Sequence, residues 1–404
     1  MDQLIPREQT QRFGVAEICR PPLAISFATS VAMMSGATML YPVLPVLAAS
    51  LGVEEAQIGL VMVAYTTPAI VLAPLFGLIA DLHGRRWMLI LGLTLFALAG
   101  GAAAFAPSFA WLLVCRALQG VAMSMLTPLT IVLISDLLSE DQEIHGQGFK
   151  VAIDRLAQIL LPLLGGALAV ISWQAAMLPY FAILPLALAA LLWMPETRAP
   201  GTETVRHYLA KTGRALREPR LTMAFATGFL RFFLDFGLYT YLPLLAVLRY
   251  GASAATAGWL IAASAAGSIF TAMSVGHIHE RQPPQRMLAV AFFASAVGLA
   301  VIATGQGLWL AALGALLFGL GNGRISPLQK SLLTRRTPPN LRGGVVAVDR
   351  VIQQIAKSMA PALMGALLLV TNLEAVFWCL TAMSALGMAT LTGLSIWRGR
   401  VRRA

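Results

Sequence analysis

Ionisable side chains at helical spacing inside long apolar runs are the residues of this sequence that could do chemistry. Arg231, Asp235 and Tyr239 follow one another at intervals of four residues, so on a helix they share one face. Asp235 lies among apolar neighbours, where a carboxyl group can take up and release a proton. These residues are therefore candidates for proton exchange, and a structural ion pair between Arg231 and Asp235 is the alternative.

Two further acids lie in apolar runs and repeat a simple spacing. Asp154 precedes Gln158 by four residues, and Asp349 precedes Gln353 by four residues. Each pair would meet on one helix face, because residues four apart are neighbours there. Asp154 and Asp349 are thus also proton-exchange candidates, and an ion pair with the arginine that follows each acid is the alternative.

The elements that position these groups must lie in a membrane. Of the 404 residues 58% are hydrophobic and 12% are charged, whereas charged residues make up about 25% of soluble domains. The composition predicts an all-α integral membrane protein that contacts the lipid bilayer along its length. The net charge of +11 would suggest nucleic acid in a soluble chain, but here we assign it to basic cytoplasmic loops and expect no nucleic-acid partner.

Metal and cofactor sites are not expected. The three cysteines are far apart, with no CxxC pair and no histidine at metal-ligand spacing. The glycine-rich segment 319–323 follows no strand and is not followed by Lys-Ser or Lys-Thr, so it does not resemble a phosphate-binding loop. No nucleophile or paired-acid motif stands out, and we predict that the protein is not an enzyme.

Twelve apolar runs are long enough to cross a bilayer, which takes about 20 helical residues. They are 23–50, 56–80, 87–105, 109–137, 146–172, 174–194, 221–248, 254–278, 286–304, 307–334, 343–370 and 373–396. If the N-terminus is cytoplasmic, nearly all basic loop residues fall on the inner side and Arg249 alone falls outside. Both termini are therefore predicted to be cytoplasmic.

The runs divide six and six about one long polar linker. We expect a cytoplasmic tail at 1–22, a six-helix bundle at 23–194, a linker at 195–220, a second bundle at 221–396 and a basic tail at 397–404. The halves match at a constant offset of 199 residues. The matched pairs are Gly52 with Gly251, Gly59 with Gly258, Gly77 with Gly276, Asp81 with Glu280, Gly120 with Gly319, Pro128 with Pro327, Pro162 with Pro361 and Gly166 with Gly365. Such an offset predicts two pseudo-symmetric bundles.

A short polar hinge at 77–86 joins the second and third runs. It resembles the loop signature of the major facilitator superfamily of transporters, with Ile79 and Leu82 departing from the usual residues. The resemblance implies twelve transmembrane helices in two bundles that alternate access to a central site. It also implies a conformational latch made by Gly77, Asp81, Gly84, Arg85, Arg86 and Asp136, and we expect Asp136 near Arg85 or Arg86.

Other motifs resemble the twelve-helix drug:proton antiporter branch of that family. In the first run, Gly36 is followed by Pro42 and Pro45, and helix kinking is the alternative explanation. In the fourth run, Arg116 and Gln119 match an Arg-x-x-Gln-Gly motif that the family is thought to use in proton coupling. The alternative is that Arg116 bonds the carbonyls freed around the two prolines.

The fifth run contains Pro162, Gly165 and Gly166, a partial match to the helix motif associated with antiporters. Close helix packing by small residues is the alternative. The match favours export over import.

The interior of the spans contains six cations and four acids, which argues against a site for dications and favours a neutral or anionic amphipathic substrate. Arg324 is the cation that we expect to be spare. The substrate-cavity candidates are Thr38, Tyr41, Gln119, Arg231, Asp235, Tyr239, Asn322 and Arg324.

The resemblance predicts a monomeric, multi-pass transporter of the plasma membrane, in a bacterium the inner membrane. It would export small drugs or metabolites in exchange for protons. A lysolipid or lipid flippase of the same fold, and a gradient-driven importer or facilitator, are the alternatives.

Overall fold

The computed structural model describes residues 15–197, 213, 219–279, 283–337 and 342–401. The predicted tail at 1–22, linker at 195–220 and tail at 397–404 lie partly outside these residues. In the described residues, eleven helices are long and apolar enough to cross a membrane, and the shorter apolar helix Leu178–Trp193 adds to them.

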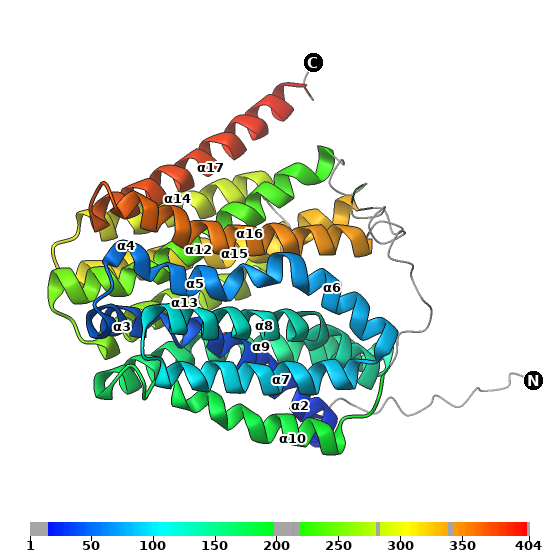
Figure 1. The fold of residues 1–404 in the computed structure, drawn as a ribbon. Helices are drawn as coiled ribbons and strands as arrows, with labels where there is room; N and C mark the ends of the chain where they lie inside the picture. Colours follow the sequence, from blue (N-terminus) through cyan, green and yellow to red (C-terminus); the bar gives the residue numbers. More distant parts are fainter. Residues whose placement is uncertain (1–14, 198–212, 214–218, 280–282, 338–341, 402–404) are drawn as a thin grey trace, which may run out of the picture.

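The first half of the chain folds into α-helices interrupted by short 3-10 turns (Figure 1). Its elements are α1 (Val15–Ile18), α2 (Pro21–Thr38), η1 (Tyr41–Val43), α3 (Leu44–Leu51), α4 (Glu55–Ile58), α5 (Leu60–Thr66), α6 (Pro68–His83), α7 (Arg85–Ala102), η2 (Ala103–Phe105), α8 (Phe109–Leu137), α9 (Glu140–Ile171), η3 (Leu178–Ile183) and α10 (Leu184–Trp193).

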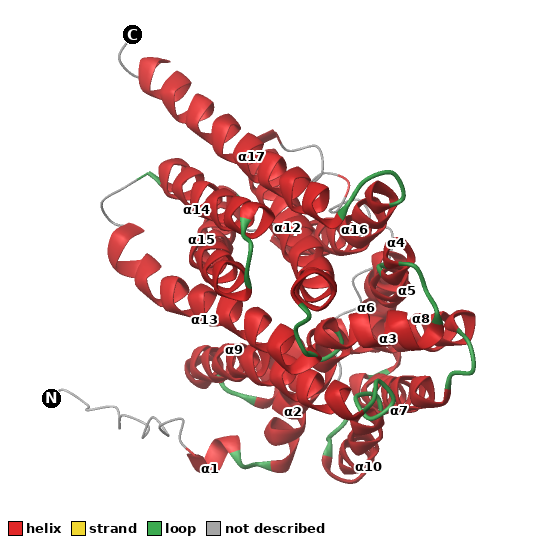
Figure 2. Ribbon diagram, turned by 90° about the vertical axis from the view of Figure 1, so that its left-hand side faces the viewer, coloured by secondary structure: helices red, strands yellow, loops and turns green. Residues whose placement is uncertain are grey.

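The second half consists of longer, less interrupted helices. They are α12 (Pro219–Tyr250), α13 (Ala254–His279), α14 (Pro284–Thr304), α15 (Leu308–Arg336), α16 (Arg342–Leu368) and α17 (Leu373–Val401). Figure 2 shows the two halves as neighbouring groups of helices, with α13 of the second half against α9 of the first.

Several predicted runs differ from the helices that form, and the run predicted at 56–80 is divided into α4, α5 and α6. The first run is broken into α2, η1 and α3, because Pro42 and Pro45 lack the amide hydrogen that a continuous helix needs. The run predicted at 174–194 begins as a helix only at Leu178. Six of its 16 residues are 3-10, so its length is about 27 Å, close to the bilayer core. The run predicted from 146 begins at Glu140, and Asp141 and Glu143 in the first turn stabilise the helix N-terminus.

The internal repeat is visible in the backbone. Gly52 ends α3 with φ 63°, and Gly251, 199 residues later, ends α12 with φ 62°. This left-handed conformation favours glycine because the residue has no Cβ. The helix crossings repeat as well: Gly120 of α8 approaches the carbonyl oxygen of Tyr65, and Gly319 of α15 approaches that of Ser264, at the same offset.

The two halves meet along two related seams at the end of the bundle where α3 and α4 lie, the left end in Figure 1 and here called the α4 end. In the first seam, a Cβ added to Gly59 would lie 2.8 Å from the carbonyl oxygen of Pro361 in α16. In the second, a Cβ added to Gly258 of α13 would lie 2.6 Å from that of Pro162 in α9. Each residue of one contact is 199 positions from its counterpart in the other, so the same type of contact closes both seams.

A hydrogen bond and stacked rings join the halves deeper in the bundle. The hydroxyls of Thr66 in α5 and Ser358 in α16 lie 2.8 Å apart. Tyr41 of η1 is buried, and its ring centroid lies 5.5 Å from that of Tyr239 and 6.0 Å from that of Phe236 in α12. The closed α4 end is therefore sealed by glycine contacts and by aromatic packing beneath them.

Candidate functional site

The hinge between α6 and α7 holds a three-residue charge network. Arg85 is only 6% exposed, and its guanidinium donates to Asp81 at 2.9 Å and also to Asp136 of α8. Asp136 thus lies beside Arg85, the first of the two arginines that the sequence offers it. Gly84 links the helices with φ 106°, which favours glycine. The network ties α6, α7 and α8 together at the end opposite the α4 end.

The other two hinge residues have different surroundings. Arg86 donates to the backbone carbonyl of Leu191 in α10 at 2.5 Å. Gly77 of α6 faces Pro128 of α8, and an added Cβ would lie 3.6 Å from the proline Cβ, an ordinary van der Waals contact. Arg86 therefore anchors α10, whereas Gly77 marks a helix crossing with room for a methyl group.

Arg116 is fully buried and bonds to a broken helix. Its guanidinium donates to Gln119 at 2.5 Å and to the carbonyl oxygen of Gly36, and it lies 4.7 Å from the ring centroid of Tyr65. That carbonyl is free because the amide of Leu40 bonds to Ala37 instead of completing an α-helical turn. The geometry favours the structural interpretation of Arg116. Its part in proton coupling stays a prediction.

The groups predicted on α12 form a polar cluster with α15. Asp235, at the middle of α12, is 6% exposed and accepts from the amide of Asn322 at 2.5 Å. Arg231 donates to the other side of that amide at 3.2 Å, and its guanidinium lies 3.8 Å from the Asp235 carboxylate. Tyr239 lies one turn further on, with its hydroxyl 3.2 Å from that of Ser264. The structure therefore brings together five of the predicted cavity residues, namely Arg231, Asp235, Tyr239, Asn322 and Tyr41, whose ring packs against that of Tyr239.

The two other candidate acids are held by partners within their own half. Asp349 accepts from Gln353 at 2.6 Å, which is the predicted pair, and from Gln329 of α15 at 2.7 Å. Asp154 does not pair with Gln158, and this part of the prediction is wrong. It accepts instead from Lys150 and from Ser30, both at 2.6 Å, because a cation four residues earlier is a stronger partner than an amide four residues later.

The amide of Gln158 is used elsewhere. Its carbonyl oxygen accepts from the guanidinium of Arg155 at 3.1 Å. Arg155 lies at the middle of α9, close enough to Arg231 and Asp235 of the other half for electrostatic interaction. The two halves therefore face each other with charged groups near the middle of their helices.

The remaining candidates make other contacts. Thr38 donates to Met34 in its own helix at 2.9 Å. Arg324 is half-buried, and its Nε has no hydrogen-bond partner. Gly165 packs against the backbone of Met39, and a Cβ on Gly166 would lie 2.6 Å from the carbonyl oxygen of Ala254. The region of Pro162, Gly165 and Gly166 is thus a close helix contact.

Lys357 of α16 joins the cluster although it was not among the predicted site residues. Its ammonium donates to the side-chain amide oxygen of Gln354 at 2.7 Å, and it lies 4.7 and 5.7 Å from the ring centroids of Phe232 and Phe236. A lysine in an apolar run, eight residues after Asp349, was the signal that could have indicated it.

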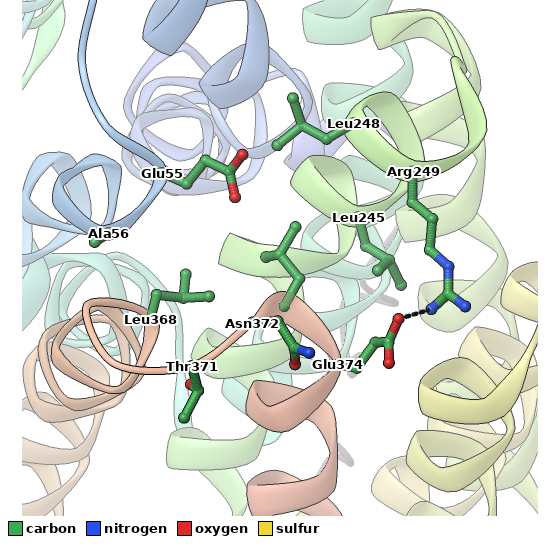
Figure 3. A pocket seen from close by; sticks show the side chains of 10 residues that line it. Glu55, Ala56, Leu245, Leu248, Arg249, Leu368, Thr371, Asn372 and Glu374 are labelled. Carbon is green, nitrogen blue, oxygen red and sulfur yellow. Dashed lines mark ion pairs between the residues drawn. The ribbon is translucent and has the colours of Figure 1, made fainter.

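A cavity of about 410 Å³ lies away from the cluster, at the α4 end. Figure 3 shows Glu55 of α4 on one side of it and Arg249 with Glu374 on the other. The guanidinium of Arg249 lies 2.8 Å from the Glu374 carboxylate, within the second half. The cavity thus borders the seam between the halves and does not contain the mid-helix charges.

Sequence comparison finds transporters. The chain is 34% identical over 148 residues to the bacillibactin exporter of Bacillus subtilis, and this match covers 35% of the chain and 36% of the exporter. It is 30% identical over 137 residues to the quinolone resistance protein NorA of Staphylococcus aureus, with 34% and 35% covered. The chain thus spans about a third of the length of the curated relatives that it matches.

Solved structures share the fold over nearly the whole chain. An inward-facing bacterial homologue of the human lysosomal transporter Spinster superposes with a TM-score of 0.71 at 16% identity, covering 95% of this chain and 96% of the other. The nucleoside transporter NupG superposes with a TM-score of 0.76 at 12% identity, covering 92% and 99%. These similarities confirm the predicted all-α membrane fold with two six-helix bundles.

The profile of the Major Facilitator Superfamily matches residues 25–361, and a second match covers residues 250–403. This confirms the resemblance seen in the hinge and excludes the enzyme classes. The chain belongs to the Major Facilitator Superfamily, and it has the multi-pass membrane fold of that family.

Proposed function

We propose that this transporter exports small amphipathic molecules, neutral or anionic, in exchange for protons. The observation that carries the proposal is Asp235, a carboxyl group at the middle of a spanning helix, 6% exposed and shared between Arg231 and Asn322. An ionisable group at this depth is costly, so it marks an ion or substrate pathway.

Exchange requires that the proton and the substrate are not bound at the same time. The ionised carboxylate of Asp235 accepts hydrogen bonds, now from Asn322, and a polar substrate hydrogen could take that place. A proton on Asp235 changes the charge and leaves fewer acceptor positions. Proton binding from one side would then favour release of the substrate there.

Alternating access has a physical basis in the two seams. Their glycine contacts hold the α4 end closed, and they can separate together because they are equivalent. From the distribution of basic residues we place the α4 end on the outside of the plasma membrane and both termini in the cytoplasm. The hinge network of Asp81, Arg85 and Asp136 would then act as a cytoplasmic latch in a monomeric protein.

The names of the relatives agree with export. One is a bacillibactin exporter and another a quinolone resistance protein. The partial antiporter motif at Pro162, Gly165 and Gly166 points in the same direction. Cations at mid-helix in both halves, among them Arg155, Arg231 and Lys357, favour a neutral or anionic substrate over a dication.

The test uses purified protein in proteoliposomes with the membrane potential clamped at zero. The probe is neutral 2-naphthalenesulfonamide, and a pH gradient of one unit is imposed. Exchange of one proton for one molecule should concentrate the probe about tenfold on the more acidic side, because one pH unit is worth about 1.36 kcal/mol per proton. Asp235→Asn should abolish accumulation while downhill movement continues, and the exposed Glu54→Gln variant is the control.

Several outcomes would contradict the proposal. A proton that moves with the probe indicates symport, and movement insensitive to pH indicates a facilitator. If Asp349→Asn abolishes accumulation and Asp235→Asn does not, the proton site is wrongly assigned.

A further inference from the structure

We propose that Lys357 and Gln354 of α16, with Phe232 and Phe236 of α12, form a binding site for aromatic anions. The ligand would be a flat aromatic molecule with a carboxylate or sulfonate group on the ring. This inference rests on the proposed function, because it names the substrate class of the same central region.

Lys357 makes no direct ion pair with a carboxylate of the described residues. Among the ion pairs within 4.0 Å that the described side chains form, none includes Lys357. Its ammonium lies 2.7 Å from the amide oxygen of Gln354 and over the Phe232 ring. A lysine near the middle of a spanning helix is expensive, and neutral partners offset its charge only in part. An anionic ligand would complete the pairing.

Gln354 supplies a second hydrogen-bond donor at the same place. Gln354 is only 7% exposed, and its Nε2 has no hydrogen-bond partner. Its Oε1 is occupied by Lys357, which orients the amide and leaves the NH₂ group free to donate. A buried donor without a partner costs about 1–3 kcal/mol. A carboxylate or sulfonate oxygen could accept from Nε2 and from the ammonium together.

The aromatic part of the ligand is indicated by the rings beside Lys357. The Phe232 ring lies 4.6 Å from the Arg231 guanidinium and 4.7 Å from the Lys357 ammonium. Phe236 lies 5.7 Å from the same ammonium and also packs against Tyr41 of the first half. Aromatic pairs stack or pack edge to face with added stability, so the rings would favour a flat aromatic body beside the anionic group.

Arg231 is less suited to this role. Its guanidinium already interacts with Asp235 and Asn322. An anion bound at Arg231 would compete with the Asp235 carboxylate and would favour its protonation, which would couple the proton and the substrate in the same direction. Lys357 makes no such ion pair with a described carboxylate, so an anion bound there would displace none.

The test measures binding and needs no gradient. The permanently charged probe 2-naphthalenesulfonate is titrated by calorimetry into the full-length protein in nanodiscs, beside neutral 2-naphthalenesulfonamide and non-aromatic cyclohexanesulfonate. We expect the naphthalenesulfonate to bind most tightly. Lys357→Gln should weaken its binding about 10- to 100-fold, the value of a lost charge-assisted hydrogen bond, and should leave the sulfonamide unaffected.

Two variants separate the local contact from general effects. Arg286→Gln removes one positive charge from the exposed first turn of α14 and should leave affinity within about twofold, because an exposed charge is screened. Gln354→Leu keeps the lysine and removes the second donor, and it should weaken naphthalenesulfonate binding about fivefold. Melting temperatures report whether each variant is folded.

The inference is overturned if the wild-type protein binds naphthalenesulfonate no more tightly than the sulfonamide. It is also overturned if Gln354→Leu and a folded Lys357→Gln both bind naphthalenesulfonate normally. Either result leaves proton-driven transport of the neutral probe intact. Conversely, selective anion binding without any response to pH would retain the inference and reject the proton coupling.

Discussion

Replacing Gly166 by alanine tests how the α4 end is held closed. The new Cβ would lie 2.6 Å from the carbonyl oxygen of Ala254 and 3.1 Å from the Cα of Ala255. Both are backbone atoms of the other half, so no side-chain rotation can relieve the overlap. Ordinary contact begins at 3.4 Å, and the helices α9 and α13 must therefore separate by about 0.8 Å.

The expected effect is a shift of the conformational equilibrium. Overpacking of this size costs about 1–3 kcal/mol. The cost applies only while the seam is closed, so the ratio of closed to open molecules should fall about 5- to 150-fold. Gly365→Ala should cause a similar shift, because Gly365 occupies the related position in the other seam and faces the carbonyl of Ala56.

Spin labels at the α4 end measure this shift. Cysteines at the exposed positions Ile171 of α9 and Trp259 of α13 carry the labels, after the three native cysteines are replaced. Pulsed electron resonance should show a longer distance component in Gly166→Ala. Gly148→Ala on the same helix is the control. Both substitutions replace a helical glycine by alanine, which stabilises the helix by about 1 kcal/mol. The Cβ added at position 148, however, has no neighbouring atom within 4 Å. Equal distance distributions in wild type and Gly166→Ala would refute the reasoning.

Three further variants probe contacts elsewhere in the bundle. Asp136→Asn deprives the buried Arg85 of one of its two carboxylates and should destabilise the protein by about 1–3 kcal/mol, seen as a lower melting temperature in detergent; an unchanged value would contradict a stabilising pair. Arg116→Lys should also lower the melting temperature, since an ammonium lacks the planar fork that now bonds a side chain and a backbone carbonyl together, and an unaltered variant would argue against that role. Ser358→Ala removes the hydrogen bond to Thr66 that joins the halves, worth about 1 kcal/mol. The same spin labels should therefore report a smaller open population than in Gly166→Ala. If they report no increase in the open population, this hydrogen bond plays no part in closure.

The repeat could be predicted from the sequence because glycine and proline are required by the backbone. A close crossing such as that of Gly59 with Pro361 tolerates no side chain, and its counterpart at Gly258 and Pro162 has the same requirement. Both copies therefore keep the same residue types at one offset. Span boundaries were less predictable, because the chain from Leu178 begins as a 3-10 helix that hydropathy does not detect.

Only those contacts of the polar cluster that lie within one helix could be predicted from the sequence. Arg231 and Asp235 lie one turn apart on α12, so their proximity follows from helix geometry. The bond from Asn322 joins residues 87 positions apart and depends on how α15 packs against α12. The position of Lys357 beside Phe232 likewise depends on the rotation of α16 about its axis. Such tertiary contacts are not encoded in spacing along a single helix.

The paired seams at the α4 end also limit how the molecule can open. Gly59 and Gly258 make the same contact on opposite flanks of the bundle, at α16 and α9 respectively. The two flanks are held by matching contacts. Neither flank is therefore favoured as a lateral opening to the bilayer. In the cycle proposed above, a tilt that frees both seams at once would open the α4 end to the outer aqueous face, and such a path would suit a dissolved solute better than a lipid that must leave sideways.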